Sequence, residues 1–358
     1  MEKSGILVIN PGSTSTKIAV YDYTRPVYLK SIKHTVEELD KFEKITDQLS
    51  FRKKLILDAL HSENIEFSNL KIIIGRGGLI KPIESGVYKV NKRMIEDLIA
   101  GVQGEHASNL GGLIAYEISS SISGAEAYIA DPVVVDEMQD VARVTGHPIF
   151  KRRSIFHALN QKAIARGYAR SVNKRYEDLN LIVAHLGGGI SIGAHQQGKV
   201  IDVNQALDGE GPLSPERSGT LPIGDLIRTC FSGKYDLKTL LKMVTGSGGY
   251  VAWFGTNDAY QVEQMAKNGN AEADLVQRSM GYQIAKYIGA MASVLKGNVD
   301  TILLTGGLAH NKTLTHYISE HVSFIAPVLV FPGEDEMKAL AMNAILILEG
   351  KIEIKEYK

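Results

Sequence analysis

The stretch VINPGSTSTKIAVYD, residues 8–22, places a glycine and four hydroxyl side chains between two apolar runs. This pattern is typical of two strands joined by a turn at residues 11–15. The turn is not a P-loop, because that motif needs a second glycine, a lysine after it, and a following helix. It is not a dinucleotide-binding fingerprint either, because G-x-G-x-x-G is absent. Two alternatives remain for the turn, a plain hairpin and a set of backbone amides that hold a phosphate.

A second stretch, LIVAHLGGGISIGAH at residues 181–195, has the same layout. In each stretch an apolar strand ends in a polar residue, a small-residue turn follows, and a second alternating strand begins. Asn10 therefore matches His185, and Gly12 matches Gly187. The repetition predicts an α/β fold of two similar domains with mixed β-sheets flanked by helices, and a cleft between them. Chance recurrence is the alternative, but the similar length of the two halves favours duplication.

The expected domains are residues 1–150, joined by a C-terminal helix at 337–358, and residues 151–336. Two further glycine turns lie in the last part of the chain. The segment LLTGG at 303–307 joins a predicted strand to a predicted helix, an order typical of nucleotide-binding crossings. The segment PGEDE at 332–336 places three acids at a helix start, where they suit the helix dipole without any function.

The composition excludes several classes of protein. Lys+Arg and Asp+Glu both number 40 in 358 residues, so no global positive charge attracts nucleic acid or anionic lipid. The basic run FKRRS, 150–154, reads as a solvated surface segment. The single cysteine excludes an intrachain disulfide and a thiolate zinc site. The apolar stretches are too short for a signal peptide or a membrane span, so we expect a cytoplasmic protein without nucleic-acid or membrane partners.

Nine motifs in one order carry a resemblance to a known family. They are VINPGSTSTK (8–17), GRGG (75–78), EHASN (105–109), IADP (129–132), RRSIFH (152–157), AHLGGGIS (184–191), PERSG (215–219), LLTGGLAHN (303–311) and PGEDE (332–336). The ordered set resembles the acetate/butyrate kinase family, within the ATPase superfamily of actin, sugar kinases and Hsp70 chaperones. The resemblance implies a duplicated actin-like fold and the reversible conversion of ATP and a short carboxylate to ADP and an acyl phosphate, with Mg²⁺.

The chain departs from the acetate kinases of that family in three motifs. It has HLGGG where they have HLGNG, RRSIFH where they have RRYGFH, and GRGG where they have an HGG region. It is also shorter. These departures are typical of butyrate and branched-chain fatty-acid kinases, so the resemblance implies butyrate or a related short acid as substrate. The alternatives are an acetate or propionate kinase and a non-acyl ATPase or sugar kinase of the same superfold. A sugar kinase would need a general-base aspartate, and the arginine-flanked motifs argue against it.

The resemblance implies four catalytic residues, Arg76, His157, Arg217 and Asp131. A carboxylate is already ionised at neutral pH, so the reaction needs cations and hydrogen-bond donors rather than a general base. The guanidinium fork suits a carboxylate or a transferring phosphoryl group, although an arginine in a loop is often a plain surface residue. His157 is expected to donate to phosphoryl oxygens.

For the carboxylate substrate the resemblance implies Arg76 and His106, and a structural role suits His106 equally well. For Mg²⁺ it implies Asp131, Asp335 and Glu336. Asp131 would act through water, because Mg²⁺ gives up its hydration shell reluctantly. An Asp-Pro turn is the alternative for Asp131. Glu334 adjoins the other two acids, so which of the three faces the metal stays open.

The resemblance implies a nucleotide site whose members come from the four turns. They are Asn10, Gly12, Ser13, Thr14, Lys17, His185, Gly187, Gly188, Gly189, Gly306, Gly307 and Asn311. The side-chain direction of Lys17 stays open, because alternation with Ile18 allows either face of its strand. The resemblance also implies a homo-oligomer, at least a dimer.

Overall fold

The computed structural model describes residues 4–358, which divide into two compact units. Unit 1 is the chain up to Val135 together with Asp335–Lys358, and unit 2 is Asp136–Glu334. The expected boundary at residues 150/151 therefore lies too far along the chain. The reason is that Glu137 accepts hydrogen bonds from Lys162 and from the backbone of Val200, which tie this segment to unit 2.

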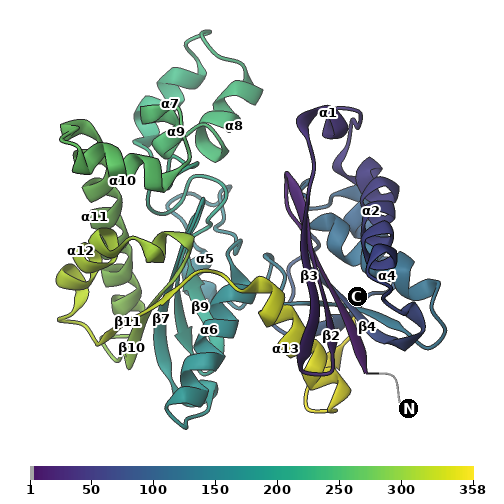
Figure 1. Cartoon of the computed structure of the whole chain (residues 1–358). Helices are drawn as coiled ribbons and strands as arrows, with labels where there is room; N and C mark the ends of the chain where they lie inside the picture. Colours follow the sequence, from purple (N-terminus) through teal and green to yellow (C-terminus); the bar gives the residue numbers. More distant parts are fainter. Residues whose placement is uncertain (1–3) are drawn as a thin grey trace. The chain divides into compact units, whose positions relative to one another are not determined.

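Unit 1 contains a seven-stranded sheet in the order β12-β5-β6-β4-β1-β2-β3 (Figure 1). Its strands are β1 (Gly5–Pro11), β2 (Ser15–Asp22), β3 (Arg25–Lys33), β4 (Leu70–Arg76), β5 (Val87–Lys89), β6 (Glu126–Ala130) and β12 (Ile354–Lys355). Its α-helices are α1 (Val36–Leu39), α2 (Leu49–Ser62), α3 (Lys92–Ala100), α4 (Asn109–Ser120) and α13 (Glu336–Leu348), with 3₁₀ turns η1 (Ile45–Gln48) and η2 (Phe67–Asn69). In Figure 1, α2 and α4 lie on one side of this sheet and α13 lies on the other.

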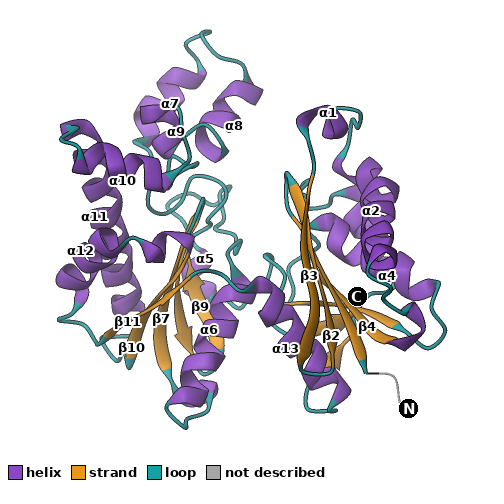
Figure 2. Cartoon of the chain, viewed as in Figure 1, coloured by secondary structure: helices purple, strands orange, loops and turns teal. Residues whose placement is uncertain are grey.

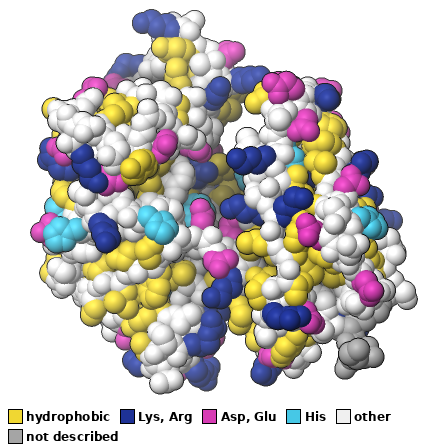
Figure 3. Space-filling model, in the orientation of Figure 1, with side chains coloured by type: hydrophobic (Ala, Val, Ile, Leu, Met, Phe, Trp, Pro, Cys, Tyr) yellow, Lys and Arg dark blue, Asp and Glu magenta, His cyan; other side chains and the backbone are white. Residues whose placement is uncertain are grey.

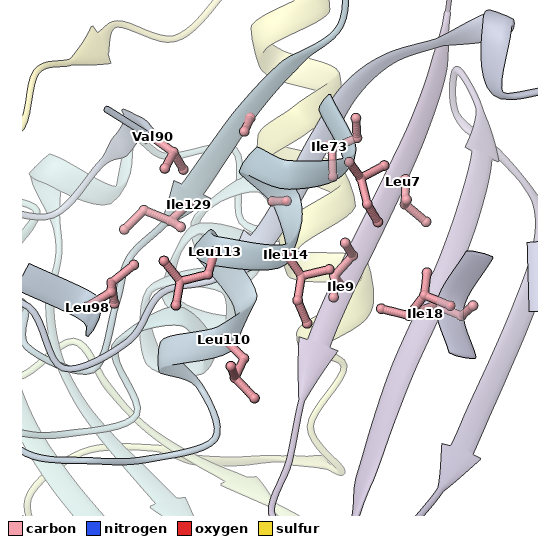
Figure 4. Close-up of a cluster of buried hydrophobic side chains, with 14 of the residues drawn as sticks. Leu7, Ile9, Ile18, Ile73, Val90, Leu98, Leu110, Leu113, Ile114 and Ile129 are labelled. Carbon is pink, nitrogen blue, oxygen red and sulfur yellow. The ribbon is translucent and has the colours of Figure 1, made fainter. Parts of the chain in front are cut away.

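The core of unit 1 lies between the sheet and α4, where Ile9 of β1 and Ile114 of α4 are fully buried (Figure 4). Helix α4 approaches β4 very closely. A Cβ at Gly75 would lie 2.1 Å from the carbonyl oxygen of Gly111, and a Cβ at Gly111 would lie 2.2 Å from that of Arg76. Only paired glycines permit such backbone contact. The carboxyl end of β4, which carries Arg76, is thereby fixed against α4.

Unit 2 contains a five-stranded sheet in the order β11-β10-β7-β8-β9 (Figure 2). Its strands are β7 (Asn180–Leu186), β8 (Ile190–Gln196), β9 (Lys199–Val203), β10 (Thr301–Gly306) and β11 (Val328–Pro332). Its helices are α5 (Asp140–Arg143), α6 (Ala158–Ser171), α7 (Ile223–Cys230), α8 (Leu237–Thr245), α9 (Gly249–Phe254), α10 (Ala259–Lys267), α11 (Ala271–Val294) and α12 (Lys312–Val322), with 3₁₀ turns η3 (Tyr176–Asp178) and η4 (Gly307–His310). Its core packs α11 and α12 against β7, β8 and β10.

The two sheets share one plan. In unit 1, β1 pairs antiparallel with β2 and parallel with β4, and β4 pairs parallel with β6. In unit 2, β7 pairs antiparallel with β8 and parallel with β10, and β10 pairs parallel with β11. The opening turn is one residue longer than its counterpart, because Pro11 pairs with Thr16 whereas Leu186 pairs with Ile190. The prediction of two similar α/β units with mixed sheets is confirmed.

The surface carries charges of both signs. Figure 3 shows lysine, arginine and acidic side chains interspersed over the face in view. Within residues 4–358, every helix lacks the combination of length and apolarity needed to cross a membrane. The single cysteine, Cys230, is exposed at the end of α7.

Candidate functional site

Arg52 of α2 donates hydrogen bonds to the turn between β1 and β2. One terminal nitrogen of its guanidinium donates to the carbonyl oxygens of Gly12 (2.8 Å) and Ser15 (3.2 Å), and the other donates to that of Ser13 (3.2 Å). The carbonyl oxygen of Thr14 accepts from the backbone N–H of His34 at 2.9 Å. All four carbonyls of the turn therefore bond within unit 1.

This arrangement leaves the amide edge of the turn on the surface. Ser13 and Thr14 are exposed, and within residues 4–358 their backbone N–H groups have no protein acceptor. Successive outward N–H groups form the concavity that binds anions. The bonds of Arg52 to these carbonyl oxygens favour an anion-binding turn over a plain hairpin, and phosphate binding at this turn stays a prediction.

Arg52 itself is fully buried. Its remaining donors bond Gln48 of η1, at 2.8 and 3.0 Å, and the Thr16 hydroxyl, at 3.1 Å. Burial lowers the pKa of Arg52 to about 10, so it stays charged at neutral pH, and no carboxylate in the described chain pairs with it. Arg52 belongs to none of the nine motifs. The signal was its spacing, since Arg52 falls on the same helix face as Ile56.

Asn10 and Arg76 meet at one carboxylate. The Asn10 amide donates to Glu336 Oε2 at 2.7 Å, and an Arg76 terminal nitrogen lies 3.2 Å from the same oxygen. Three elements supply this cluster, because Asn10 lies near the end of β1, Arg76 ends β4, and Glu336 begins α13. Lys17 lies directly opposite Asn10 in the antiparallel pair, so its exposed side chain shares the face of Asn10. The open question about Lys17 is thereby answered.

Asp131 lies just beyond β6 and is 2% exposed. Its Oδ1 accepts from the Ser85 hydroxyl at 2.6 Å and from the Gly86 backbone N–H at 2.8 Å. Its backbone has φ +38°, a conformation that L-residues other than glycine seldom adopt. Such strain persists only where surrounding contacts hold it, and it is concentrated at functional sites. The structure thus fixes this carboxylate firmly.

His106 lies in the loop before α4 and makes local hydrogen bonds. Its Nδ1 accepts from the Ser108 backbone N–H at 3.2 Å and lies 2.8 Å from the Ser108 hydroxyl. The neutral ring therefore carries its proton on Nε2. Both readings of His106 remain compatible with this geometry.

The three consecutive acids take three different directions. Glu334 Oε2 lies 3.5 Å from His185 Nε2 in unit 2. Asp335 caps α13 by accepting from the Lys338 backbone N–H at 2.9 Å. Glu336 binds Asn10 and Arg76 in unit 1. Nowhere in residues 4–358 do three His, Cys, Asp or Glu side chains gather as a ready-made metal cage, so Asp131, Asp335 and Glu336 do not form one.

In unit 2, His157 and His185 stack with ring centroids 3.8 Å apart and planes 11° apart. His157 immediately precedes α6 and His185 lies in β7. His185 Nδ1 lies 2.8 Å from Asn160 Oδ1, an acceptor, so Nδ1 carries a proton. His185 is 1% exposed. The two predicted histidines are brought together, and the sequence analysis missed Asn160 as their neighbour.

The glycine turn after β7 is shaped around Arg217. A Cβ at Gly189 would lie 1.7 Å from an Arg217 terminal nitrogen, so only glycine leaves room for the guanidinium. That nitrogen also donates to the carbonyl oxygen of Ala206. Burial lowers the pKa of Arg217, against the opposing effect of Glu216. The Nε of Arg217 is buried beside this glycine turn, and its N–H has no hydrogen-bond partner within residues 4–358.

The remaining predicted residues lie at the end of β10. Gly306 has φ +93°, and a Cβ there would lie 2.3 Å from the Leu186 carbonyl oxygen. Gly307 opens the 3₁₀ turn η4 and is exposed. Asn311 caps α12 by accepting from the Leu314 backbone N–H at 2.9 Å. The strand, glycine turn and helix expected here are confirmed.

Comparison with known proteins identifies relatives over the whole chain. The Acetokinase family matches residues 143–326. Butyrate kinase 2 of Clostridium acetobutylicum is 55% identical over 356 residues, which are 99% of this chain and 100% of that protein.

Two crystal structures match the fold. Acetate kinase from Porphyromonas gingivalis superposes with a TM-score of 0.79 at 20% identity, covering 96% of this chain and 100% of that one. A propionate kinase from Francisella tularensis superposes with a TM-score of 0.76 at 18% identity, covering 95% and 98%. These two matches show a shared fold, and the full-length sequence match shows the family. The chain therefore belongs to the acetokinase family and is an ATP-dependent carboxylate kinase.

Proposed function

We propose that this kinase phosphorylates butyrate and related short or branched-chain fatty acids, rather than acetate or propionate, as its preferred substrates. The observation that carries this proposal is the 55% identity to a butyrate kinase over nearly the full chain. The three motif departures from the acetate kinases support it independently. In the proposed reaction a carboxylate oxygen attacks the γ-phosphorus of ATP. The bond to the β–γ bridging oxygen breaks, and ADP leaves.

In unit 1 we assign Arg76 to the carboxylate and the transferring phosphoryl group. Its guanidinium lies at the carboxyl end of β4 and is one-fifth exposed, so it can receive an anion. Glu336 supplies the negative partner that keeps the guanidinium in place until substrate binds. His106 is assigned to the carboxylate through its Nε2–H. The amides of Ser13 and Thr14, with Asn10 and Lys17, are assigned to phosphate oxygens.

In unit 2 we assign the nucleotide to the glycine turns. Gly188 is exposed and can present its backbone to phosphates, whereas Gly187 and Gly189 are buried beside it. Gly306 and Gly307 allow close approach at the end of β10. Asn311 is assigned to the adenosine side of this group. His157 acts as a donor to phosphate oxygens, and His185 is assigned to the phosphates beside its turn. Arg217 presents an orphan Nε–H to the charge that develops on the phosphoryl group.

The donor set also fits Mg²⁺. Magnesium prefers carboxylate oxygens and keeps several waters when it binds nucleotide phosphates, so a site with one or two protein carboxylates suffices. Asp131 and Glu336 are the favoured holders because their carboxylates are fixed by neighbouring donors. Asp335 is less suited, since its Oδ1 already caps α13. The ion would neutralise charge on the ATP phosphates.

A hydroxylamine trap tests the proposed substrate class. The protein, Mg²⁺ and ATP are incubated with butyrate, isobutyrate, valerate, propionate or acetate, and the acyl hydroxamate is measured. We expect product with butyrate, and loss of product in Arg76→Ala. Arg93→Ala is the matched control, because Arg93 is exposed and pairs only weakly with Asp97 at 3.8 Å. If none of the five acids gives an acyl hydroxamate, the proposal is wrong.

We also propose a homo-oligomer in the cytoplasm, where ATP is available. The oligomer is supported by exposed apolar side chains on α7, on α8 and at Phe231 directly after α7, which isolated subunits rarely leave uncovered. The side chains are Ile223, Ile227, Phe231, Leu237 and Leu241, of which Phe231 is 88% exposed. Sedimentation velocity tests this assignment. A native dimer or larger species that dissociates in Phe231→Glu is expected, and a monomeric native chain would contradict it.

A further inference from the structure

A buried chain of hydrogen bonds runs from Tyr176 to His157 inside unit 2. The Tyr176 hydroxyl lies 2.7 Å from His195 Nδ1, and His195 Nε2 lies 2.9 Å from Gln161 Oε1. Gln161 Nε2 then donates to the carbonyl oxygen and to the hydroxyl of Ser191, at 3.0 and 2.8 Å. The Ser191 hydroxyl lies 2.9 Å from His157 Nδ1. Of the five residues in this series of hydrogen bonds, His157 alone has a role in the proposed function.

The donor and acceptor of each hydrogen bond follow from the Ser191 carbonyl oxygen. The carbonyl oxygen of Ser191 can only accept, so the atom of Gln161 that faces it must be the amide nitrogen. The other end of Gln161 is therefore its carbonyl oxygen, which can only accept from His195 Nε2–H. His195 is fully buried, and burial lowers its pKa well below the ordinary value, so the ring is neutral and its Nδ1 accepts from Tyr176.

The same logic reaches His157. The Ser191 hydroxyl oxygen accepts from Gln161 Nε2 and, at 3.4 Å, from the His157 backbone N–H. The Ser191 hydroxyl therefore donates its proton to His157 Nδ1. A neutral His157 whose Nδ1 accepts carries its own proton on Nε2.

Two further observations show that the fold accommodates this series of hydrogen bonds. A Cβ at Gly193 would lie 2.7 Å from Gln161 Oε1 and 3.2 Å from His195 Nε2, so glycine at this strand position makes room for their bond. Gln161, Ser191 and His195 are each fully buried, so water does not compete for their partners. These contacts account for Ser191, Gly193 and His195 in the stretch GISIGAH, residues 189–195.

We propose that Gln161 and Ser191 are positioning residues, which hold His157 in the neutral tautomer that presents Nε2–H to the transferring phosphoryl group. The inference rests on the proposed role of His157. The stacked ring of His185 holds its proton on Nδ1 through Asn160, so the two rings have opposite tautomers. The hydrogen-bond chain supplies no proton to the product. It sets which nitrogen donates, and so acts before the reaction begins.

Nuclear magnetic resonance tests the tautomer without reference to activity. The full chain is labelled with ¹⁵N-histidine, His157 is assigned from the signal lost in His157→Gln, and long-range ¹H–¹⁵N correlations are recorded at neutral pH. We expect the pattern of a ring protonated on Nε2 only. Ser191→Ala should convert this signal to a mixture of tautomers, and Ser191→Thr should restore it. A ring protonated on Nδ1 in the native chain would overturn the inference.

Steady-state kinetics tests the consequence. Ser191→Ala is expected to lower kcat at least about tenfold, less than the ~10²–10³ lost when a transition-state donor is removed outright. KM for ATP and for the acid should change less than about twofold, because the donor acts in the transition state. Ser319→Ala, which removes a hydroxyl whose one partner among residues 4–358 is the Thr315 carbonyl oxygen, should leave kcat unchanged. An unchanged kcat in a folded, active Ser191→Ala would overturn the inference, whereas a native chain without kinase activity would overturn the proposed function alone.

Discussion

Replacing Arg52 by methionine tests whether this side chain builds the phosphate turn. Methionine has similar length and keeps the apolar packing of α2, but it cannot donate any of the six hydrogen bonds that Arg52 makes. The Ser15 carbonyl oxygen would keep the Gly12 N–H at 2.7 Å. Three acceptors would lose their Arg52 donors, namely the carbonyl oxygens of Gly12 and Ser13 and the Gln48 Oε1.

The expected loss follows from those three acceptors. A buried acceptor left without a partner costs about 1–3 kcal/mol, so three cost about 3–9 kcal/mol. Ser13 is exposed and its carbonyl can turn to water, so we expect the lower part of that range, about 3–5 kcal/mol in the free energy of unfolding. Because the amide edge would no longer be fixed, the affinity for ATP should fall as well.

The matched control is Lys54→Met on the same helix. Lys54 pairs with Asp58 at 2.6 Å, but its side chain is 75% exposed, so the change should stay within about 0.5 kcal/mol. Urea unfolding followed by circular dichroism measures stability, and calorimetry measures ATP binding. A loss below about 1 kcal/mol in Arg52→Met, or native ATP affinity in the destabilised variant, would refute the reasoning.

Three further predictions concern the metal, the second nucleotide turn and pH. Asp131→Asn keeps an oxygen for Ser85 and Gly86 but removes the charge, so the Mg²⁺ concentration for half-maximal rate should rise without loss of fold; an unchanged requirement would contradict the metal assignment. Gly306→Ala would force a Cβ to 2.3 Å from a backbone oxygen and strain a φ of +93°, so calorimetry should detect weaker ATP binding, and native affinity would count against the close approach. Burial, with the nearby Arg52 charge, lowers the pKa of His34 to about 4. The unfolded chain therefore binds a proton that the folded chain does not between about pH 4 and 6.5, and the unfolding free energy should rise with pH by at most about 1.4 kcal/mol per unit from this group. Urea unfolding at pH 5 and 7 should show a smaller rise in His34→Gln, and an identical rise would refute the assignment.

The local structure was predictable from the sequence because neighbouring residues specify it. Alternating apolar residues on both sides of a small-residue turn indicated the paired strands of both units. Helix α3 has residue types at both ends that mark helix ends in a sequence: the Asn91 side chain accepts from the Met94 N–H at its start, and Gly101 has φ +63° at its end. The equivalence of Asn10 and His185 followed from the repeat alone.

The contacts that organise the site depend on residues far apart in the chain. Arg52 reaches the turn from 40 positions away, and Gln161 reaches Ser191 across 30. The spacing of Arg52 from Ile56 places both on the buried face of α2, but it gives no indication of the hydrogen-bond partners of Arg52. The three acids at 334–336 were ambiguous because adjacent residues at a helix start diverge into different directions. The domain boundary was misplaced because residues 136–150 have no regular pattern and owe their place to ion pairs and single backbone bonds.

The substrate preference is the central claim, and a series of kcat/KM values measures it most directly. Each methylene in an apolar pocket contributes about 1–3 kcal/mol, a factor of about 10–200, so selectivity should be graded across the acids. With acetate, propionate, butyrate, isobutyrate and valerate at saturating Mg-ATP, we predict that kcat/KM peaks at butyrate or isobutyrate and exceeds the acetate value by at least about tenfold. A maximum at acetate or propionate would contradict the account.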